Sequence, residues 1–405
     1  MSKTETYDKN RRLYFLDNLR TFIIFLVILY HAGGVYESTG MWASFWIVDD
    51  AATNNLVGIF NLIFDIFIMP TMFFISGFLT PLSLERKGAG MFLTMRFRRL
   101  MIPWVLAVLT LIPLYKVIYL ASRGLPQEHW TTYFHFSSGN ITSQSWLWFL
   151  PVLFLFNLLF VLLTKVNLVP KDFSFRIAIF AVMVIGFATT YAMDMLNLRG
   201  WTLTPLIDFQ NERLLLYFMV FLLGSLAFHK QIFTSKATNR RLYTIVNAVA
   251  WVPVTAYIVF LVFPLFSQGS FILSRVFDKF IVWLSFYLAL LANMYLFIET
   301  FRRYLDKTGN LWHELNQNAY YVYIIHMIVL GACALLLLKI ATPSLVKYII
   351  LTMATFFISN LMVSVYRRLT VPRNAAKQMT NASRPSPPLP SPPLPSPHHR
   401  RGPEV

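Results

Sequence analysis

Residues 14–35 read YFLDNLRTFIIFLVILYHAGGV, and this stretch decides the fold class of the chain. It is an apolar run about as long as the roughly 20 residues that a helix needs to cross a bilayer. Further runs of similar length follow, and together they cover residues 14–35, 56–80, 100–121, 146–164, 175–194, 212–229, 243–265, 276–298, 319–338 and 345–366. The sequence therefore predicts an all-α polytopic membrane protein with about ten transmembrane helices. We expect a multi-pass protein of the cell (inner or plasma) membrane, without a cleaved signal.

The composition supports this prediction. Of the 405 residues, 57% are hydrophobic and only 13% are charged, whereas an average soluble domain has roughly 25% charged residues. A soluble protein of this length needs more charged surface than the chain contains. This excludes an ordinary cytosolic enzyme and a nucleic-acid-binding module. The single cysteine, Cys333, excludes an intrachain disulfide and a cysteine-based metal site.

Lysine and arginine are distributed unevenly over the segments between the runs. The N-terminus, every second connecting segment and the C-terminal part carry 26 of the 35 basic residues, whereas the alternate segments carry 6. The remaining three, Arg20, Lys116 and Lys279, lie within runs. Because cytoplasmic loops are enriched in lysine and arginine, the alternation predicts that both termini are cytoplasmic. The net charge of +17 then reflects membrane orientation, and we expect no nucleic-acid partner.

Three regions follow from this topology. Residues 1–13 form a cytoplasmic N-terminal segment, and residues 14–366 form the transmembrane domain. Residues 367–405 form a cytoplasmic tail, in which PSPPLPSPPLPSP (385–397) favours an extended polyproline conformation over helix or sheet. We expect this tail to be disordered and dispensable, with a docking role as the alternative.

The first run carries two ionisable residues of the kind that mark functional sites in membranes. Eleven residues separate Arg20 from His31, about three helical turns, so both lie on one helix face about 16 Å apart along the axis. Arg20 lies near the expected cytoplasmic end, and His31 lies in the outer half. Such a face can hold an anion at one end and support proton transfer at the other. The alternative is an arginine that extends to the interface and a histidine that bonds a neighbouring helix.

Two other motifs border the expected inner face. The cluster Arg96-Phe97-Arg98-Arg99 precedes the third run and suits phosphate groups, although such a cluster also acts as a topology signal. The stretch FFISGFL (73–79) ends the second run, and Gly77 within it permits the close approach of a ligand. The alternative for Gly77 is helix packing.

Together these motifs resemble acyltransferase family 3, a family of polytopic membrane proteins. They follow the family's order over about residues 12–366: R-x10-H (Arg20, His31), FFxSGFL (73–79), RxxR (Arg96, Arg99), LWFLP (147–151) and YxIH (Tyr323 to His326). The stretch from Tyr14 to His31 is most similar to the branch associated with the succinylation of periplasmic glucans. The Pro-rich tail lies outside the family pattern.

The resemblance implies a membrane O-acyltransferase that moves an acyl group, acetyl or succinyl, from cytosolic acyl-coenzyme A to a hydroxyl of a periplasmic or cell-surface glycan or a lipid-linked sugar. The donor would contact Arg96, Arg99, Ser76 and Gly77. Its phosphates would lie near Arg20, and its pantetheine arm, on the order of the 16 Å rise, would bring the thioester to His31. His31 would act as a general base, with a covalent acyl-histidine as the less favoured variant. Acyl-coenzyme A is a substrate, and we expect no permanently bound cofactor and no metal.

Two residues are candidates to assist His31. His326 lies in the inner half of the ninth run and has either a catalytic role or a hydrogen bond that bridges helices. Asp65 lies in the outer half of the second run, at a depth similar to that of His31. It would either orient the imidazole or make a packing hydrogen bond. The predicted catalytic group therefore contains His31, Arg20, His326 and Asp65.

Three residues are candidates to contact the acceptor on the outer side. Glu212 and Arg213 open the sixth run, with an interfacial ion pair as the alternative. Trp148 would stack on a sugar, although Trp148 and Trp146 also fit the outer aromatic belt of a membrane protein.

Two other function classes fit part of the pattern. A transporter or exporter of lipid-linked sugars would also use intramembrane charges and ten spans. Against it, the sequence has no evident inverted repeat, and the arginines suited to phosphate lie on one face only. A non-enzymatic assembly partner that uses the Pro-rich tail as its hook leaves Arg20 and His31 unexplained. The sequence leaves open the acyl group, the acceptor and the oligomeric state.

Overall fold

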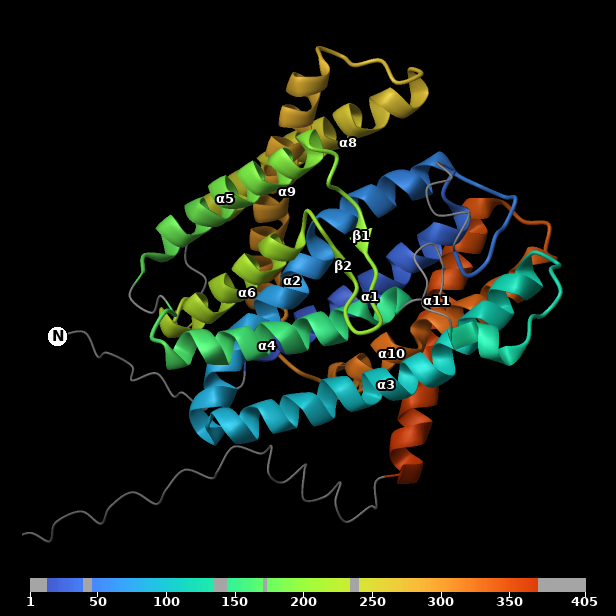
Figure 1. The fold of residues 1–405 in the computed structure, drawn as a ribbon, viewed down its shortest axis with the longest axis horizontal. Helices are drawn as coiled ribbons and strands as arrows, with labels where there is room; N and C mark the ends of the chain where they lie inside the picture. The colour runs from blue at the N-terminus through green and yellow to red at the C-terminus, as the bar shows by residue number, and fades with distance from the viewer. Residues whose placement is uncertain (1–12, 39–45, 135–143, 170–172, 234–239, 371–405) are drawn as a thin grey trace, which may run out of the picture.

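The computed structural model describes residues 13–38, 46–134, 144–169, 173–233 and 240–370, and this part of the chain is mainly helical (Figure 1). The predictions for residues 1–12 and for the tail from 371 onward lie outside the described residues, whereas residues 367–370, predicted to belong to the tail, continue the last helix. The α-helices are α1 (Tyr14–Tyr36), α2 (Asn55–Lys87), α3 (Ala89–Ser122), α4 (Phe149–Lys165), α5 (Phe175–Met195), α6 (Leu214–His229), α7 (Arg240–Val249), α8 (Trp251–Phe266), α9 (Arg275–Tyr304), α10 (Asn310–Leu338) and α11 (Ser344–Thr370). Short 3-10 helices, η1 (Trp130–Phe134) and η2 (Ser145–Trp148), precede α4, and a hairpin of β1 (Trp201–Thr202) and β2 (Phe209–Gln210) precedes α6.

Nine segments of the described chain are long and apolar enough to cross a membrane. One of them, Arg240–Phe266, consists of α7 and α8 together. The predicted run 212–229 is occupied by α6, which is apolar but only 16 residues long. The chain is therefore an all-α, multi-pass membrane protein, and the sixth helix is shorter than predicted.

The first and last helices reach the same side of the bundle. The backbone N–H of Phe15 donates to Oδ1 of Asp306, in the turn between α9 and α10, over 3.1 Å. Near the end of α11, Arg367 pairs over 3.6 Å with Glu314, which lies in the first turns of α10. A chain that starts and ends on one side makes an even number of passes. Counting α6 with the nine longer segments gives this even number, and the assignment of that side to the cytoplasm remains a prediction.

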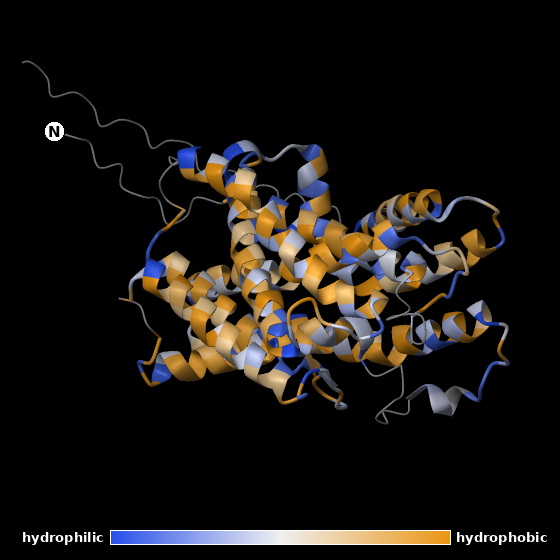
Figure 2. Cartoon of the chain, turned by 90° about the horizontal axis from the view of Figure 1, so that it is seen from above, coloured by the Kyte–Doolittle hydropathy of each residue, from blue (hydrophilic) through white to orange (hydrophobic). Residues whose placement is uncertain are grey.

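The outside of the bundle is apolar, as a bilayer requires. Phe180 on α5, Val252 on α8 and Leu361 on α11 are each about two thirds exposed. Figure 2 shows apolar residues along the helices and hydrophilic residues mainly near their ends and in the turns. The interior helix is α1, which buries most of its length against α2, α9, α10 and α11. The residues predicted to carry chemistry on α1 are therefore held inside the protein.

The parallel helices α1 and α10 are fixed in register by a buried polar network. Thr21 Oγ1 donates to Oδ1 of Asn316 over 2.5 Å, and Asn316 Nδ2 donates to Oδ1 of Asn18 over 2.8 Å. Ten residues separate Thr21 from His31 and likewise Asn316 from His326. The register set by Thr21 and Asn316 is therefore kept about 15 Å further along, where the histidines meet.

This network also corrects the predicted depth of His326. α10 begins at Asn310, before the start of the predicted run 319–338, because polar side chains in its first turns bond neighbouring helices. Asn318, for example, donates to Ser364 on α11 over 2.8 Å. His326 therefore lies beyond the midpoint of α10, at the level of His31, and not in the inner half of its helix.

α6 is short because the chain enters it from within the bundle. Arg213, which precedes its first turn, pairs with Asp65, ten residues after the start of α2. The start of α6 is thus set back by about 15 Å from the start of α2. The hairpin β1–β2, which precedes α6 in the chain, lies across the front of the bundle in Figure 1.

Two glycines let α2 and α6 pack closely below that point. A Cβ atom on Gly77 would collide with the backbone oxygen of Phe221, and one on Gly224 would collide with the backbone oxygen of Phe74. Small residues at helix interfaces allow backbones to approach in this way. Gly77 therefore faces a helix, and its predicted approach to a ligand is replaced by helix packing.

Candidate functional site

The structure brings the two predicted histidines into contact inside the bundle. Nε2 of His326 lies 3.2 Å from Nδ1 of His31, and the ring centroids are 5.0 Å apart. They come from helices that are adjacent in space but 295 residues apart in sequence. The contact joins the first and the last of the family-like motifs in a single site.

Hydrogen bonds around the rings determine which nitrogens carry protons. A carbonyl oxygen only accepts, so a neutral ring nitrogen that faces one is the protonated nitrogen. Nδ1 of His31 lies 2.8 Å from the carbonyl of Val27, and Nδ1 of His326 lies 2.7 Å from that of Tyr323. His326 Nε2 then has a lone pair that accepts from the Nδ1–H of His31. The remaining nitrogen, Nε2 of His31, also carries a lone pair, as a general base needs.

The two histidines differ in accessibility. His326 has no exposed surface, whereas His31 is partly accessible. A reacting group must be reached by its substrate, and a supporting group need not be. Of the two histidines, only His31 is therefore open to a substrate.

Two tryptophans flank the histidine pair. The ring of Trp46 stacks on His31 with centroids 5.6 Å apart, and its Nε1 donates to the backbone oxygen of His31 over 3.0 Å. On the other side, the ring of Trp146 lies 6.5 Å from that of His326, and its Nε1 donates to the backbone oxygen of Ile324 over 3.0 Å. Trp46 was not predicted, because a tryptophan in a loop has no periodicity to reveal its contacts.

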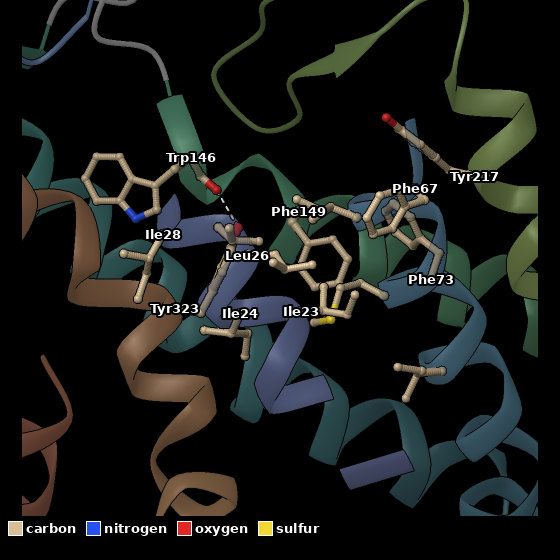
Figure 3. Close-up of a cluster of buried hydrophobic side chains, with 14 of the residues drawn as sticks. Ile23, Ile24, Leu26, Ile28, Phe67, Phe73, Trp146, Phe149, Tyr217 and Tyr323 are labelled. Carbon is tan, nitrogen blue, oxygen red and sulfur yellow. Dashed lines mark hydrogen bonds between the residues drawn. The ribbon is translucent and has the colours of Figure 1, made fainter. Parts of the chain in front are cut away.

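Trp146 is a correction to the predicted aromatic belt. It is 3% exposed and accepts, through its backbone oxygen, a hydrogen bond from the hydroxyl of Tyr323. Figure 3 shows this bond beside a cluster of buried apolar side chains that includes Ile23 and Phe149. Trp146 is thus an internal residue, because the short η2 turns it inward onto α10.

The loop that carries Trp46 is fastened by a buried ion pair. Asp50 Oδ2 and Lys347 Nζ lie 2.8 Å apart, and both side chains are almost fully buried. Ile47 of the same loop contacts α10 at Gly331, where a Cβ atom would collide with it. These contacts hold Trp46 against His31.

The basic residues predicted to bind the donor lie along the other end of α10. Arg20 Nη2 lies 3.4 Å from the backbone oxygen of Asn316 and 3.5 Å from Asp17. One turn further along α10, the ring of Tyr320 lies 5.9 Å from the guanidinium of Arg99, and its hydroxyl donates to the backbone oxygen of Arg99. Arg20 and Arg99 are therefore held on successive turns of the helix that carries His326.

Arg96 and Arg99 belong to α3 itself. The helix begins at Ala89, whereas the predicted run begins at residue 100. The Arg96 guanidinium lies 5.1 Å from the centre of the Phe92 ring, and the Arg99 side chain is exposed. A helix places residues three apart on one face, so the two arginines extend from a rigid element and not from a loop.

Comparison with known proteins agrees with this arrangement. A family model described as an acyltransferase domain matches residues 13–363. The chain belongs to acyltransferase family 3. This family 3 chain is similar to glucans biosynthesis protein C of Salmonella schwarzengrund (strain CVM19633), 27% identical over 262 residues, and of Escherichia coli O139:H28 (strain E24377A / ETEC), 27% identical over 258 residues. Each alignment covers 60% of this chain and 65% of the relative, just under two thirds of the relative's length. No solved structure is found to match the chain.

In this family 3 protein, Asp65 does not lie against the histidines as an orienting group. Asp65 nevertheless lies at nearly the same depth as the histidines. Asn61, one turn before it on α2, packs against Gly33, which is two residues after His31 on α1. The carboxylate of Asp65, however, accepts from Arg213 Nη2 over 2.6 Å, and its backbone oxygen accepts from Nη1 over 3.1 Å. Asp65 thus pairs with a residue predicted for the acceptor, a contact that the spacing in sequence does not reveal.

Glu212 and Arg213 are not partners of each other in the contacts of the described chain. Glu212 braces the hairpin, since its carboxylate accepts from the backbone N–H of Gly200 over 3.1 Å and from Gln210 Nε2 over 3.2 Å. Each residue forms an ion pair with a different partner, Glu212 with Arg199 over 3.9 Å and Arg213 with Asp65 over 2.6 Å, which agrees with the ion-pair alternative. Arg213 reaches α2, and Glu212 closes the turn before it.

The remaining predicted residues are Ser76 and Trp148. Ser76 lies in the middle of a helical turn of α2, where its backbone oxygen accepts from Thr80 over 2.8 Å. Trp148 is half-buried, stacks on Tyr217 with centroids 5.8 Å apart, and contacts Trp201 edge-on at 5.4 Å. Trp148 thus belongs to the same region as Arg213, whereas Ser76 belongs to the α2 turn beside Gly77.

Proposed function

We propose that this protein is a membrane O-acyltransferase that moves an acyl group from cytosolic acyl-coenzyme A to a hydroxyl of a glycan on the opposite side of the membrane. The observation that carries the proposal is the histidine pair, in which Nε2 of His31 keeps a lone pair and His326 accepts from its other nitrogen. Membership of an acyltransferase family supports it.

The donor would bind at the basic end of α10. The phosphates of coenzyme A carry several negative charges, which charge-assisted hydrogen bonds from arginine stabilise. Arg20 and Arg99 contact α10 on successive turns, and Arg96 lies on the same face of α3 as Arg99. Arg20 lies about 16 Å from His31 along α1, a distance on the order of an extended pantetheine arm. The thioester would then reach His31 while the nucleotide stays at the basic end.

His31 would transfer one proton in each half of the reaction. Its Nε2 takes the proton of the acceptor hydroxyl as the oxygen attacks the thioester carbonyl. The carbon–sulfur bond then breaks, and the proton goes from His31 to the departing thiolate, which leaves as coenzyme A. While His31 is an imidazolium, its Nδ1–H donates to His326 Nε2 and to the carbonyl of Val27. This charge-assisted bond stabilises the cation that forms during the reaction.

The names of the relatives support a proposal for the acceptor. The similar proteins are named for glucan biosynthesis, so we propose a glucan as the acceptor, and we propose succinyl or acetyl as the acyl group because the family resemblance implies them. We further propose that the protein lies in an inner membrane, with the basic end of α10 facing the cytosol and the histidines accessible from the other side.

Labelled acyl-coenzyme A tests the proposal. Membranes that contain the protein are incubated with labelled acetyl- and succinyl-coenzyme A, and label on glycan is measured. We expect transfer with wild-type protein and a loss of about 10²- to 10⁴-fold in His31→Ala, because general base catalysis contributes by that factor. His31→Gln is the sharper variant, because glutamine keeps hydrogen bonds but cannot accept the proton.

His129→Gln is the matched control, because His129 is an exposed histidine in the loop after α3. It should transfer label at the wild-type rate. Near-normal transfer in His31→Gln, or sugar transport without any acyl transfer in the wild type, would contradict the proposal.

A further inference from the structure

A charged pair lies beside the length of α2 that α6 leaves uncovered. Asp65 and Arg213 are joined over 2.6 Å, and the Asp65 side chain is 31% exposed although it belongs to a membrane-spanning helix. Charged groups in such helices face the bundle interior or a water-filled space and not lipid. The exposed part of this carboxylate therefore faces a space that water can enter.

Arg213 has hydrogen-bonding capacity left over. The residue is only 5% exposed, and its Nε is without a hydrogen-bond partner among the residues that the structure describes. A buried N–H group without a partner is costly, so such groups are normally satisfied by protein, water or ligand. The unpaired Nε–H belongs to the same guanidinium group that holds the Asp65 carboxylate.

An aromatic surface adjoins the pair. We call Trp148, Trp201 and Tyr217 the tryptophan shelf. Tyr217 lies near Arg213 and stacks on Trp148, which contacts Trp201 edge-on. Trp201, on the hairpin, is 45% exposed. The shelf thus runs from the buried guanidinium to the surface.

The pair also adjoins the proposed reacting group. The ring of Tyr30 contacts that of His31 with centroids 5.5 Å apart, and its hydroxyl lies within electrostatic range of Asp65. Tyr30 and His31 are consecutive residues, and α1 and α2 meet near this level through Gly33 and Asn61. The side chain of Tyr30 therefore links His31 to a ligand bound at the Asp65–Arg213 pair.

We propose that the Asp65–Arg213 pair and the tryptophan shelf bind a sugar residue of the acceptor and present its hydroxyl to His31. This inference rests on the proposed function, since it names the acceptor site of that reaction. Because Trp201 is exposed on the hairpin, the acceptor would enter from the hairpin side.

The chemistry of the site selects a neutral, hydroxylated ligand. A hydroxyl both donates and accepts, which matches a carboxylate beside a guanidinium N–H. An anionic headgroup would be repelled by Asp65. A flat aromatic ring offers large contact area to the C–H face of a sugar ring, and sites for small molecules commonly combine such rings with a few polar groups.

Binding of a β-linked glucose hexasaccharide to the full-length protein in detergent, without acyl-coenzyme A, tests the inference. Affinity is measured by calorimetry for the wild type, Trp201→Ala and Arg213→Lys. We expect Trp201→Ala to weaken binding about two- to tenfold, the range of one aromatic contact. Arg213→Lys keeps the charge but loses the Nε–H and should weaken it about tenfold or more. Because Trp201 is nearly half exposed and lies on the hairpin, its variant tests the site without disturbing the bundle.

Trp251→Ala is the matched control, because Trp251 is 66% exposed on α8 and lies outside the shelf. It should bind as the wild type does. Equal affinity in Trp201→Ala and Trp251→Ala, or no binding by the wild type, would overturn the inference. Label transfer to glycan in the wild type with an unchanged acceptor KM in Trp201→Ala would refute the site and leave the proposed function standing. The expected binding differences without any transfer would keep the site and refute the function.

Discussion

Replacement of His326 tests whether it supports His31 by accepting a hydrogen bond from it. His326→Leu removes the acceptor of the His31 Nδ1–H bond, whereas His326→Gln retains a side-chain oxygen that can accept it. The bond is neutral before reaction, worth about 1 kcal/mol, and becomes charge-assisted when His31 holds the proton, worth about 1.5–3 kcal/mol. The difference of about 0.5–2 kcal/mol acts only on the reacting state. It corresponds to a loss of about 2- to 30-fold in kcat.

The assay measures initial rates of label transfer from acyl-coenzyme A to glycan at several donor concentrations. We expect His326→Leu to lower kcat within the range given above and to leave the donor KM unchanged, with His326→Gln closer to the wild type. Both should remain far more active than His31→Gln. The reasoning is refuted if His326→Leu, inserted in normal amount, is as inactive as His31→Gln, because His326 would then be the base. A wild-type rate in His326→Leu would equally refute the supporting role.

Two further predictions concern the donor and the packing. Arg96→Ala combined with Arg99→Ala should raise the donor KM about tenfold or more, since each removes a charge-assisted contact, while the exposed neighbour Arg98→Ala serves as control. An unchanged donor KM with inverted insertion would identify the cluster as a topology signal only. Gly77→Leu should lower the melting temperature and the yield in membranes, at a cost of at least about 1–3 kcal/mol, because its side chain meets the α6 backbone. Gly90→Ala, which meets nothing within 4 Å, should not, and equal stability of the two variants would speak against the close α2–α6 contact.

The features that the sequence predicts correctly are local ones. Hydropathy over about 20 residues identifies the membrane helices, and a spacing of eleven residues suffices to put Arg20 and His31 on one face. Both depend only on helix geometry. The family-like motifs then predicted the family, which the match over residues 13–363 confirms.

The features that it misses depend on partners distant in sequence. The polar first turns of α10 lowered its hydropathy, although Asn316 is buried against α1. The predicted depth of His326 was therefore wrong. The partner of Asp65 is 148 residues away in the sequence. The spacing of residues along the chain does not indicate whether Asp65 pairs with Arg213 or with His31. The sequence predicts an interfacial Trp146 because tryptophan at a helix start is typical of the membrane interface.

The fastened loop over His31 bears on a competition that every acyl transfer to a hydroxyl faces. Water is itself a hydroxyl nucleophile, far more concentrated than any glycan, and it would convert the thioester to a free acid. Trp46 covers one face of the His31 ring, and the Asp50–Lys347 pair keeps it there. In the proposed reaction, with that face closed, the acceptor would approach His31 from the side of Asp65 and Arg213, where a bound sugar would displace solvent. The ion pair between this loop and α11 would then influence the ratio of transfer to hydrolysis, although neither of its members touches the reacting atoms.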